Sequence, residues 1–233
     1  MIVAIAAVLG IAGGTAVGYG VQAERAPTPL SALAQPDLAY PAKAADRLPD
    51  PLPAAQDRRV RTDGDLRKLV IPRPAGWSEN KDASFVQDGW TEVEDYALDF
   101  EGEDFMFGRL LESDVRRIAS ATWKKGEYRT VYLSLVQFAS GTGTPAAEHA
   151  EAQRMYMPDE KRGAGNSGDA IKGSLNGRYY VYEVDRKPGY LPLYRARAVF
   201  DRGDVMVDIH LSDTRSISKK DIRTLAERQL ERL

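Results

Sequence analysis

The chain of 233 residues contains no cysteine and only two histidines. Without cysteine it has no thiol nucleophile, disulfide bond, iron–sulfur cluster or cysteine-ligated zinc, and no lipid can be attached to an N-terminal cysteine. Two histidines are too few for a histidine-rich metal site. We therefore expect neither a bound metal nor a cofactor.

The chain also has little net charge. Its 32 Lys and Arg residues are opposed by 34 Asp and Glu residues, which gives a formal net charge of −2 and a pI near 5.8. A protein that binds nucleic acid displaces counterions from phosphates with a concentrated basic surface. The near balance of charge therefore argues against a nucleic-acid partner.

Charged side chains are absent from residues 1–23, where Ala, Gly, Val, Ile and Leu predominate. A helix of roughly 20 residues extends about 30 Å, which is the thickness of the hydrocarbon core of a bilayer. We predict that residues 1–22 form a transmembrane helix or signal anchor in the lipid bilayer of the cell membrane, with a single pass and the C-terminal part outside. The alternative is a signal peptide cleaved near Ala23, which would release a secreted protein.

Small residues recur along one side of this apolar segment. Gly10, Gly14 and Gly18 are spaced by four and would share one face of a helix. Such a face lets two membrane helices approach closely, so it indicates a homodimer as one interpretation. The other interpretation is chance spacing in a segment rich in Ala and Gly.

Residues 23–64 have the composition of a linker. Seven of the thirteen prolines fall here, together with many alanines and interspersed charges. Proline interrupts helices and sheets and favours extended conformers, so we predict a disordered Pro/Ala-rich stalk. The remaining residues, 65–233, have the length of one ordinary domain, which we expect to be extracytoplasmic.

Apolar residues repeat with periods of two and of 3.6 through residues 65–233. Strands are predicted at 66–71, 115–123, 128–138, 169–173, 178–185, 194–200 and 205–211, and helices from Val93, at 104–111, at 145–157 and after Ser218. The fold class is therefore α+β, an antiparallel sheet with helices packed on it.

Two local details of this prediction can be checked in the structure. Thr91 and Glu94 have the spacing of a capping box for the helix that starts at Val93. The paired strands 194–200 and 205–211 alternate between apolar and polar residues, which predicts one buried face and one face in solvent.

His210 and Asp208 are the candidate pair for catalysis. They are two residues apart in a predicted strand and so share a face, and a histidine oriented by a carboxylate is a typical general base. Without a nucleophile motif such as G-x-S-x-G, the ordinary interpretation is a solvated surface pair. An envelope hydrolase that uses His210 and Asp208 is therefore the alternative function, and we expect no enzyme.

Other patterns have structural explanations. The run from Gly163 to Gly168 matches G-x-G-x-x-G, but no strand precedes it and no helix follows, so we interpret it as a flexible loop. Eight acidic residues and no basic residue lie between Asp88 and Asp104, where we expect a solvated face rather than a calcium site. The tripeptide from Arg202 to Asp204 is interpreted as a turn.

Tyrosines gather in the second half of the chain, and they are the best candidates for a contact site. Tyrosine offers apolar area and a hydroxyl at small entropic cost, as binding surfaces require, although its preference for strands also explains the pattern. The candidate contact residues for a ligand or partner are Tyr180, Tyr182, Tyr190, Tyr194 and Arg195.

Several segments together resemble known proteins: 63–69, 121–126, 131–138, 189–198 and 226–233. They are similar to uncharacterised exported or membrane-anchored proteins of actinobacteria. The order of elements resembles the PsbP-like α/β/α sandwich of accessory subunits and of LpqN-type actinobacterial lipoproteins, although this chain lacks the cysteine that carries the lipid. The resemblance implies binding or assembly and provides no catalytic residues. We expect a membrane-tethered, non-enzymatic, extracytoplasmic domain that binds a cell-envelope partner or a small ligand.

Overall fold

The computed structural model describes residues 14, 15, 17–19, 21, 23, 25, 64–139 and 144–233. The chain divides into two compact units, Met1–Asp50 and Pro51–Leu233. In the first unit Gly14 and Gly18 are helical, whereas Gly10 lies outside the described residues. No helix among the described residues is both long and apolar enough to cross a membrane. Most of the predicted anchor at 1–22 and of the predicted stalk at 23–64 falls outside the described residues.

The second unit is built on an eight-stranded sheet in which every pairing is antiparallel. The strands are β1 (Ser78–Glu79), β2 (Trp90–Thr91), β3 (Val115–Lys125), β4 (Arg129–Phe138), β5 (Asp169–Ala170), β6 (Arg178–Val181), β7 (Tyr194–Arg202) and β8 (Val205–Asp213). Their order is β1-β3-β4-β8-β7-β6-β5, and β2 also pairs with β3. The hairpin β3–β4 thus meets the later hairpin β7–β8 along β4 and β8.

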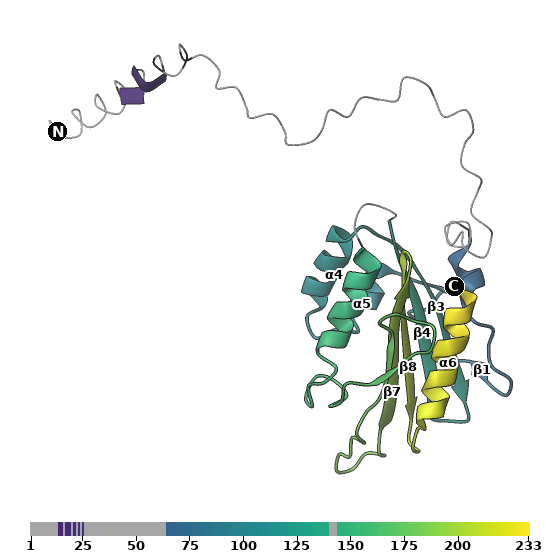
Figure 1. The fold of residues 1–233 in the computed structure, drawn as a ribbon. Helices are drawn as coiled ribbons and strands as arrows, with labels where there is room; N and C mark the ends of the chain where they lie inside the picture. Colours follow the sequence, from purple (N-terminus) through teal and green to yellow (C-terminus); the bar gives the residue numbers. More distant parts are fainter. Residues whose placement is uncertain are drawn as a thin grey trace, which may run out of the picture. The chain divides into compact units, whose positions relative to one another are not determined.

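Helices cover both faces of this sheet (Figure 1). They are the 3₁₀ helix η1 (Leu66–Leu69) and the α-helices α3 (Val93–Ala97), α4 (Glu103–Glu112), α5 (Pro145–Met155) and α6 (Lys219–Arg232). The buried residues of α3, α4 and α5 pack against one face, and those of α6 pack against the other. The predicted α+β class is confirmed for the described residues, and the layers follow the order helix, sheet, helix.

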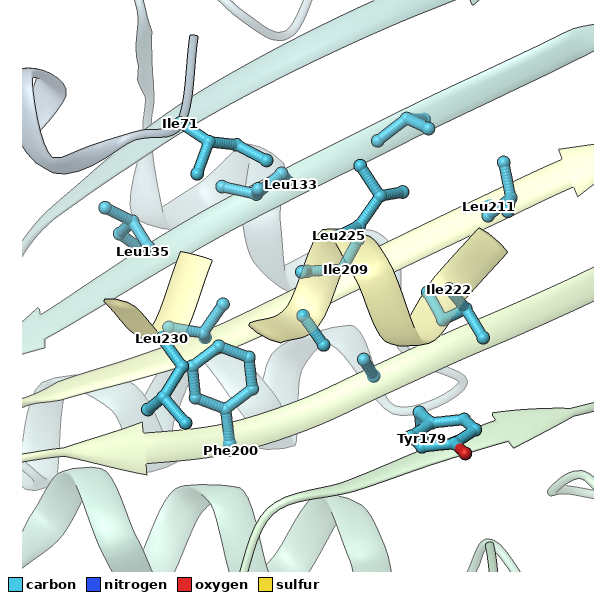
Figure 2. Packing of buried hydrophobic residues seen from close by; sticks show 14 of the residues in the cluster. Ile71, Leu133, Leu135, Tyr179, Phe200, Ile209, Leu211, Ile222, Leu225 and Leu230 are labelled. Atoms are coloured by element: carbon cyan, nitrogen blue, oxygen red, sulfur yellow. The ribbon is translucent and has the colours of Figure 1, made fainter. Parts of the chain in front are cut away.

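The face under α6 is an apolar core. Ile222, Leu225 and Leu230 of α6 lie over Ile209 and Phe200 of the sheet (Figure 2). These three helix residues are spaced as one stripe, which is why the helix could be predicted from its sequence. Burying each such side chain contributes about 1.5–3 kcal/mol.

Both ends of α6 are held by specific hydrogen bonds. Ser218 accepts from the backbone of Asp221, and the Asp221 carboxylate accepts from the backbone of Ser218, so the expected cap is a full capping box. Near the other end, Gln229 is buried and bridges the backbones of Leu69 and Ile71 at 2.9 Å each. Helix α6 therefore holds the backbone of residues 69–71 in place.

That segment differs from the predicted strand at 66–71. The structure has η1 instead, because the Asp65 side chain accepts from the Arg67 backbone and caps a 3₁₀ turn. The following backbone groups bond to side chains of α6, including Arg232 to Val70 at 3.0 Å, rather than to a sheet edge. The strand prediction is wrong at this position.

Two further expectations need correction. Thr91 caps no helix, since it pairs with Ile118 in the sheet, and α3 begins after Glu92 without a side-chain cap. Arg197 is 4 % exposed and Asp208 is 2 % exposed, so the polar sides of β7 and β8 are buried at these positions. Helix α5 packs over this part of both strands, and the predicted exposure to solvent holds farther along, at Arg195 and His210.

Candidate functional site

The structure places the five candidate contact residues in different regions: Tyr182 packs near Tyr180 and contacts Arg195, whereas Tyr190 and Tyr194 lie elsewhere. Tyr190 and Tyr194 lie at one end of the sheet, in and just after the connection between β6 and β7. Tyr180 is buried on the sheet face covered by α3, α4 and α5, where it packs with Met157. The alternation of strand residues therefore prevents the tyrosines from forming one continuous surface.

Tyr190 lines a hollow of about 750 Å³, which we call the tyrosine hollow. Its walls come from the β3–β4 turn, the β6–β7 connection and the residue after β8, and its lining comprises Tyr128, Asp185, Lys187, Gly189, Tyr190, Leu191, Leu193 and Thr214. Tyr190 is 79 % exposed, and Tyr128 is also exposed. The hollow thus offers two aromatic rings, with charged and hydroxyl groups beside them.

A tight turn presents Tyr190. Pro188 and Gly189 occupy its centre, Gly189 has φ of +83°, and the Tyr190 N–H donates to the Lys187 carbonyl at 3.1 Å. Proline followed by a residue with positive φ is typical of a type II turn. The β6–β7 connection that carries this turn projects beyond the end of β7 (Figure 1), and paired backbone bonds between Asp185 and Leu193 close its base at 2.9 Å.

The other candidates have structural contacts. The Arg195 guanidinium lies 4.6 Å from the centre of the Tyr182 ring, a cation–π contact at a partly exposed site. Tyr194 is partly buried against the core under α6, and its hydroxyl accepts from Arg186 at 3.4 Å. Of the five candidates, Tyr190 is the one that lines the tyrosine hollow.

The glycine-rich run from Gly163 to Gly168 packs near Tyr180 and Met157, on the sheet face covered by α3, α4 and α5. A Cβ at Gly163 would lie 2.3 Å from the Tyr156 carbonyl oxygen, and a Cβ at Gly168 would lie 2.5 Å from the Tyr180 ring. Gly168 also has φ of +65°. Close packing, rather than flexibility or phosphate binding, therefore explains these two glycines.

A buried ion pair lies beneath α5. Arg197 donates to both carboxylate oxygens of Asp208, at 2.9 and 2.5 Å, and to Gln153 at 3.0 Å. Its third contact is the Tyr156 hydroxyl, which itself donates to Gln153 at 2.8 Å. Burial raises the pKa of Asp208, but Arg197 and His210 outweigh burial and hold that pKa well below its usual range.

His210 extends from this ion pair toward solvent. Its Nε2 lies 3.0 Å from Asp208 Oδ1, its side chain is 45 % exposed, and its ring stacks on Tyr132 with the centroids 6.3 Å apart. The structure thus brings the candidate catalytic pair together. Among the described residues, however, His210 hydrogen-bonds to Asp208 alone, and Ser134 opposite Asp208 is buried and bonded to Ser120.

The second histidine, His149, is a buried residue of α5. His149 Nε2 lies 3.2 Å from the Tyr96 hydroxyl, and burial lowers the pKa of His149 from 6.5 to about 4. It is therefore neutral at ordinary pH. The described part of the chain contains no group of three or more His, Asp or Glu residues placed to hold a metal ion.

Part of the chain is similar to a solved structure of an extracellular domain. No protein-family model matches the chain, and no curated protein matches it. The extracellular domain of PknH from Mycobacterium tuberculosis is similar at 11% sequence identity and a TM-score of 0.31, over 54% of this chain and 70% of that chain. A TM-score of this size does not establish a common fold. The comparisons give no PsbP-like match.

Proposed function

We propose that the chain is a membrane-tethered, extracytoplasmic, non-enzymatic domain that binds a cell-envelope partner or a small ligand at the tyrosine hollow. The observation that carries this proposal is the convergence of three separate connections on one hollow, with Tyr128 and Tyr190 exposed in its lining. Aromatic side chains with a polar tip supply much contact area for little loss of side-chain entropy.

The binding site is tested with single substitutions in the full chain. Tyr190→Ser and Tyr128→Ser each remove one ring, and Leu175→Ser is the control because Leu175 is fully exposed and lies outside the hollow. The probes are soluble cell-wall glycan fragments and vesicles of total membrane lipid, measured separately. Either tyrosine change should weaken binding about tenfold, from the loss of roughly 1–2 kcal/mol of aromatic burial. Binding unchanged in both tyrosine variants would exclude the hollow as the site.

Support for the tether comes from the uncharged residues 1–23 and the proline-rich residues that follow. N-terminal sequencing of the protein from the membrane fraction should find an intact N-terminus. A mature chain that begins just after Ala23 in the culture medium would establish secretion instead. The proposed homodimer through Gly10, Gly14 and Gly18 predicts that Gly14→Ile changes the oligomeric state.

The alternative is an envelope hydrolase, and the contact between His210 and Asp208 favours it. Support for the non-enzymatic proposal comes from the engagement of Asp208, whose two oxygens both accept hydrogen bonds from Arg197. A panel of ester, peptide and glycan substrates separates the two. Turnover that disappears in His210→Ala would establish the hydrolase.

A further inference from the structure

A second hollow lies between α4 and α5, on the sheet face that also holds the ion pair. Its volume is about 450 Å³, and its lining comprises Asp99, Phe100, Glu101, Gly102, Phe105, Met106, Ala152, Gln153, Tyr156 and Arg162. We call it the α4–α5 groove. It shares no lining residue with the tyrosine hollow.

The groove is apolar, with apolar side chains exposed beside it. Phe105 is 71 % exposed on α4, and Met155, at the end of α5, is 76 % exposed. Large apolar side chains left in solvent next to a hollow mark interaction surfaces, and methionine adapts its shape to different partners. The exposed Phe105 ring therefore offers an apolar contact within the groove itself.

The charge on this surface is mainly negative. Asp99 and Glu101 line the groove, and neither makes an ion pair with any residue that the structure describes. They belong to the stretch from Asp88 to Asp104, which has eight acidic residues and no basic one. Arg162 is the single basic residue of the lining. A cation would therefore find unpaired carboxylates next to apolar side chains.

The floor of the groove carries a polar group with an unused donor. Gln153 is buried, and its carbonyl oxygen accepts from both Arg197 and Tyr156. Within the described residues its amide nitrogen Nε2 donates no hydrogen bond. This nitrogen can donate a hydrogen bond to an acceptor such as a peptide carbonyl.

We infer that the α4–α5 groove binds a peptide segment of a partner protein in which apolar side chains stand next to Lys or Arg. The apolar side chains occupy the groove against Phe100, Phe105 and Met106. The Lys or Arg side chains pair with Asp99 and Glu101. This inference stands on residues distinct from those of the tyrosine hollow, so either can fail alone.

The probe is a short acetylated peptide of Leu, Lys and Gly carrying a fluorescent label, with a matched peptide in which Glu replaces every Lys. Binding is measured by fluorescence anisotropy with the full chain in phosphatidylcholine nanodiscs at low salt, and empty nanodiscs provide the background. The lysine peptide should bind and the glutamate peptide should not. Equal binding of the two peptides, or no binding of either, would overturn the inference.

Substitutions locate the binding. Phe105→Ser should lower the affinity for the lysine peptide about tenfold, since it removes an exposed apolar contact. Asp99→Asn with Glu101→Gln should lower this affinity roughly threefold to tenfold and make it less dependent on salt. The matched controls are Leu175→Ser and Glu112→Gln, which leave the groove intact and should not change binding. A lysine peptide that binds both groove variants as tightly as the original chain would contradict the assignment.

Arg162→Ala provides a test in the opposite direction. Removing the single basic residue of the lining should raise the affinity for the lysine peptide by about twofold to threefold at low salt. Weaker binding would show that Arg162 itself contacts the ligand, contrary to the inference. Full displacement of the peptide by tetramethylammonium alone would identify a small organic cation as the occupant and overturn the peptide assignment.

Discussion

The two faces of the sheet are buried by different means. Under α6 the core consists of aliphatic and aromatic side chains, among them Ile209, Phe200 and Leu230. Under α3, α4 and α5 the buried residues include an ion pair, Arg197 with Asp208, together with amide, hydroxyl and imidazole groups. Burial of the second face depends on matched hydrogen bonds, and part of that face remains open to solvent at His210.

The two faces therefore contribute to the stability of the fold in different ways. Apolar burial is favourable wherever it occurs, so the α6 face stabilises the fold in proportion to the area it removes from water. A buried ion pair offsets its own desolvation only when both partners are present, and well-packed apolar residues of similar size often serve as well. The polar face also borders the α4–α5 groove through Gln153 and Tyr156. The polar residues of this face are therefore the ones whose identity can depend on binding as well as on stability.

The largest effect is expected from Asp208→Ala. The substitution leaves the buried Arg197 without its carboxylate, and breaking such a pair lowers the free energy of unfolding by about 3–5 kcal/mol. Urea unfolding of the full chain measures the loss. The double substitution Arg197→Met with Asp208→Leu should recover most of it, because no unpaired charge remains. A double variant as unstable as the single one would show that the ion pair itself stabilises the fold.

The next effect belongs to the apolar face. Ile222→Ala removes a fully buried side chain of α6 and should lower the free energy of unfolding by about 3 kcal/mol, through lost burial and the cavity left behind. Ile222→Leu keeps the volume and should cost less than about 1.5 kcal/mol. The same urea experiment compares them. An Ala variant no less stable than the Leu variant would contradict close packing under α6.

The contrast between the faces also explains what could be predicted from the sequence. Helix α6 has its signals in its own residues, because the apolar stripe and the Ser218–Asp221 cap are local. Strands β7 and β8 were predicted from alternation, but alternation does not show that α5 covers their polar side. The burial of Arg197 and Asp208 depends on Gln153, which lies 44 positions from Arg197 in the chain.

Non-local partners explain the other differences. The apolar run at 66–71 fits a strand, yet its backbone bonds to Gln229, which is 158 positions from Ile71. Tyr190 was predicted as a contact residue from the density of tyrosines, and it lines a hollow. The sequence shows the acidic stretch up to Asp104 but does not predict the α4–α5 groove, because a groove is formed only when two distant helices are placed together.

Acid pH should lower the free energy of unfolding through His149, which is buried on the polar face. This histidine is buried and neutral, with a folded pKa of about 4 against 6.5 when unfolded, so protons bind preferentially to the unfolded chain as the pH falls through this window. Between pH 7 and pH 5 the free energy of unfolding should fall by about 2 kcal/mol from this group. Asp99 and Asp201 have raised pKa values and act in the opposite direction at lower pH. His149→Gln keeps both of them, so the difference between variant and parent isolates His149, and parallel pH profiles would refute the assignment.

The smallest effect concerns the end of α6 on the apolar face. Ser218→Ala removes the side-chain oxygen that accepts from the Asp221 backbone, and the loss of an N-cap costs about 1 kcal/mol. Asp221 keeps its ion pair with Arg129 at 2.9 Å, so the change reports the two hydrogen bonds of the Ser218 hydroxyl, which also donates to the Asp221 carboxylate. Ser218→Thr should retain most of the stability, because its hydroxyl can make both of these hydrogen bonds. Urea midpoints in the order Ser218, Thr and Ala, with an unchanged dependence on denaturant, would place this cap among the local determinants of the apolar face, whereas equal midpoints for all three would show that packing alone fixes the start of α6.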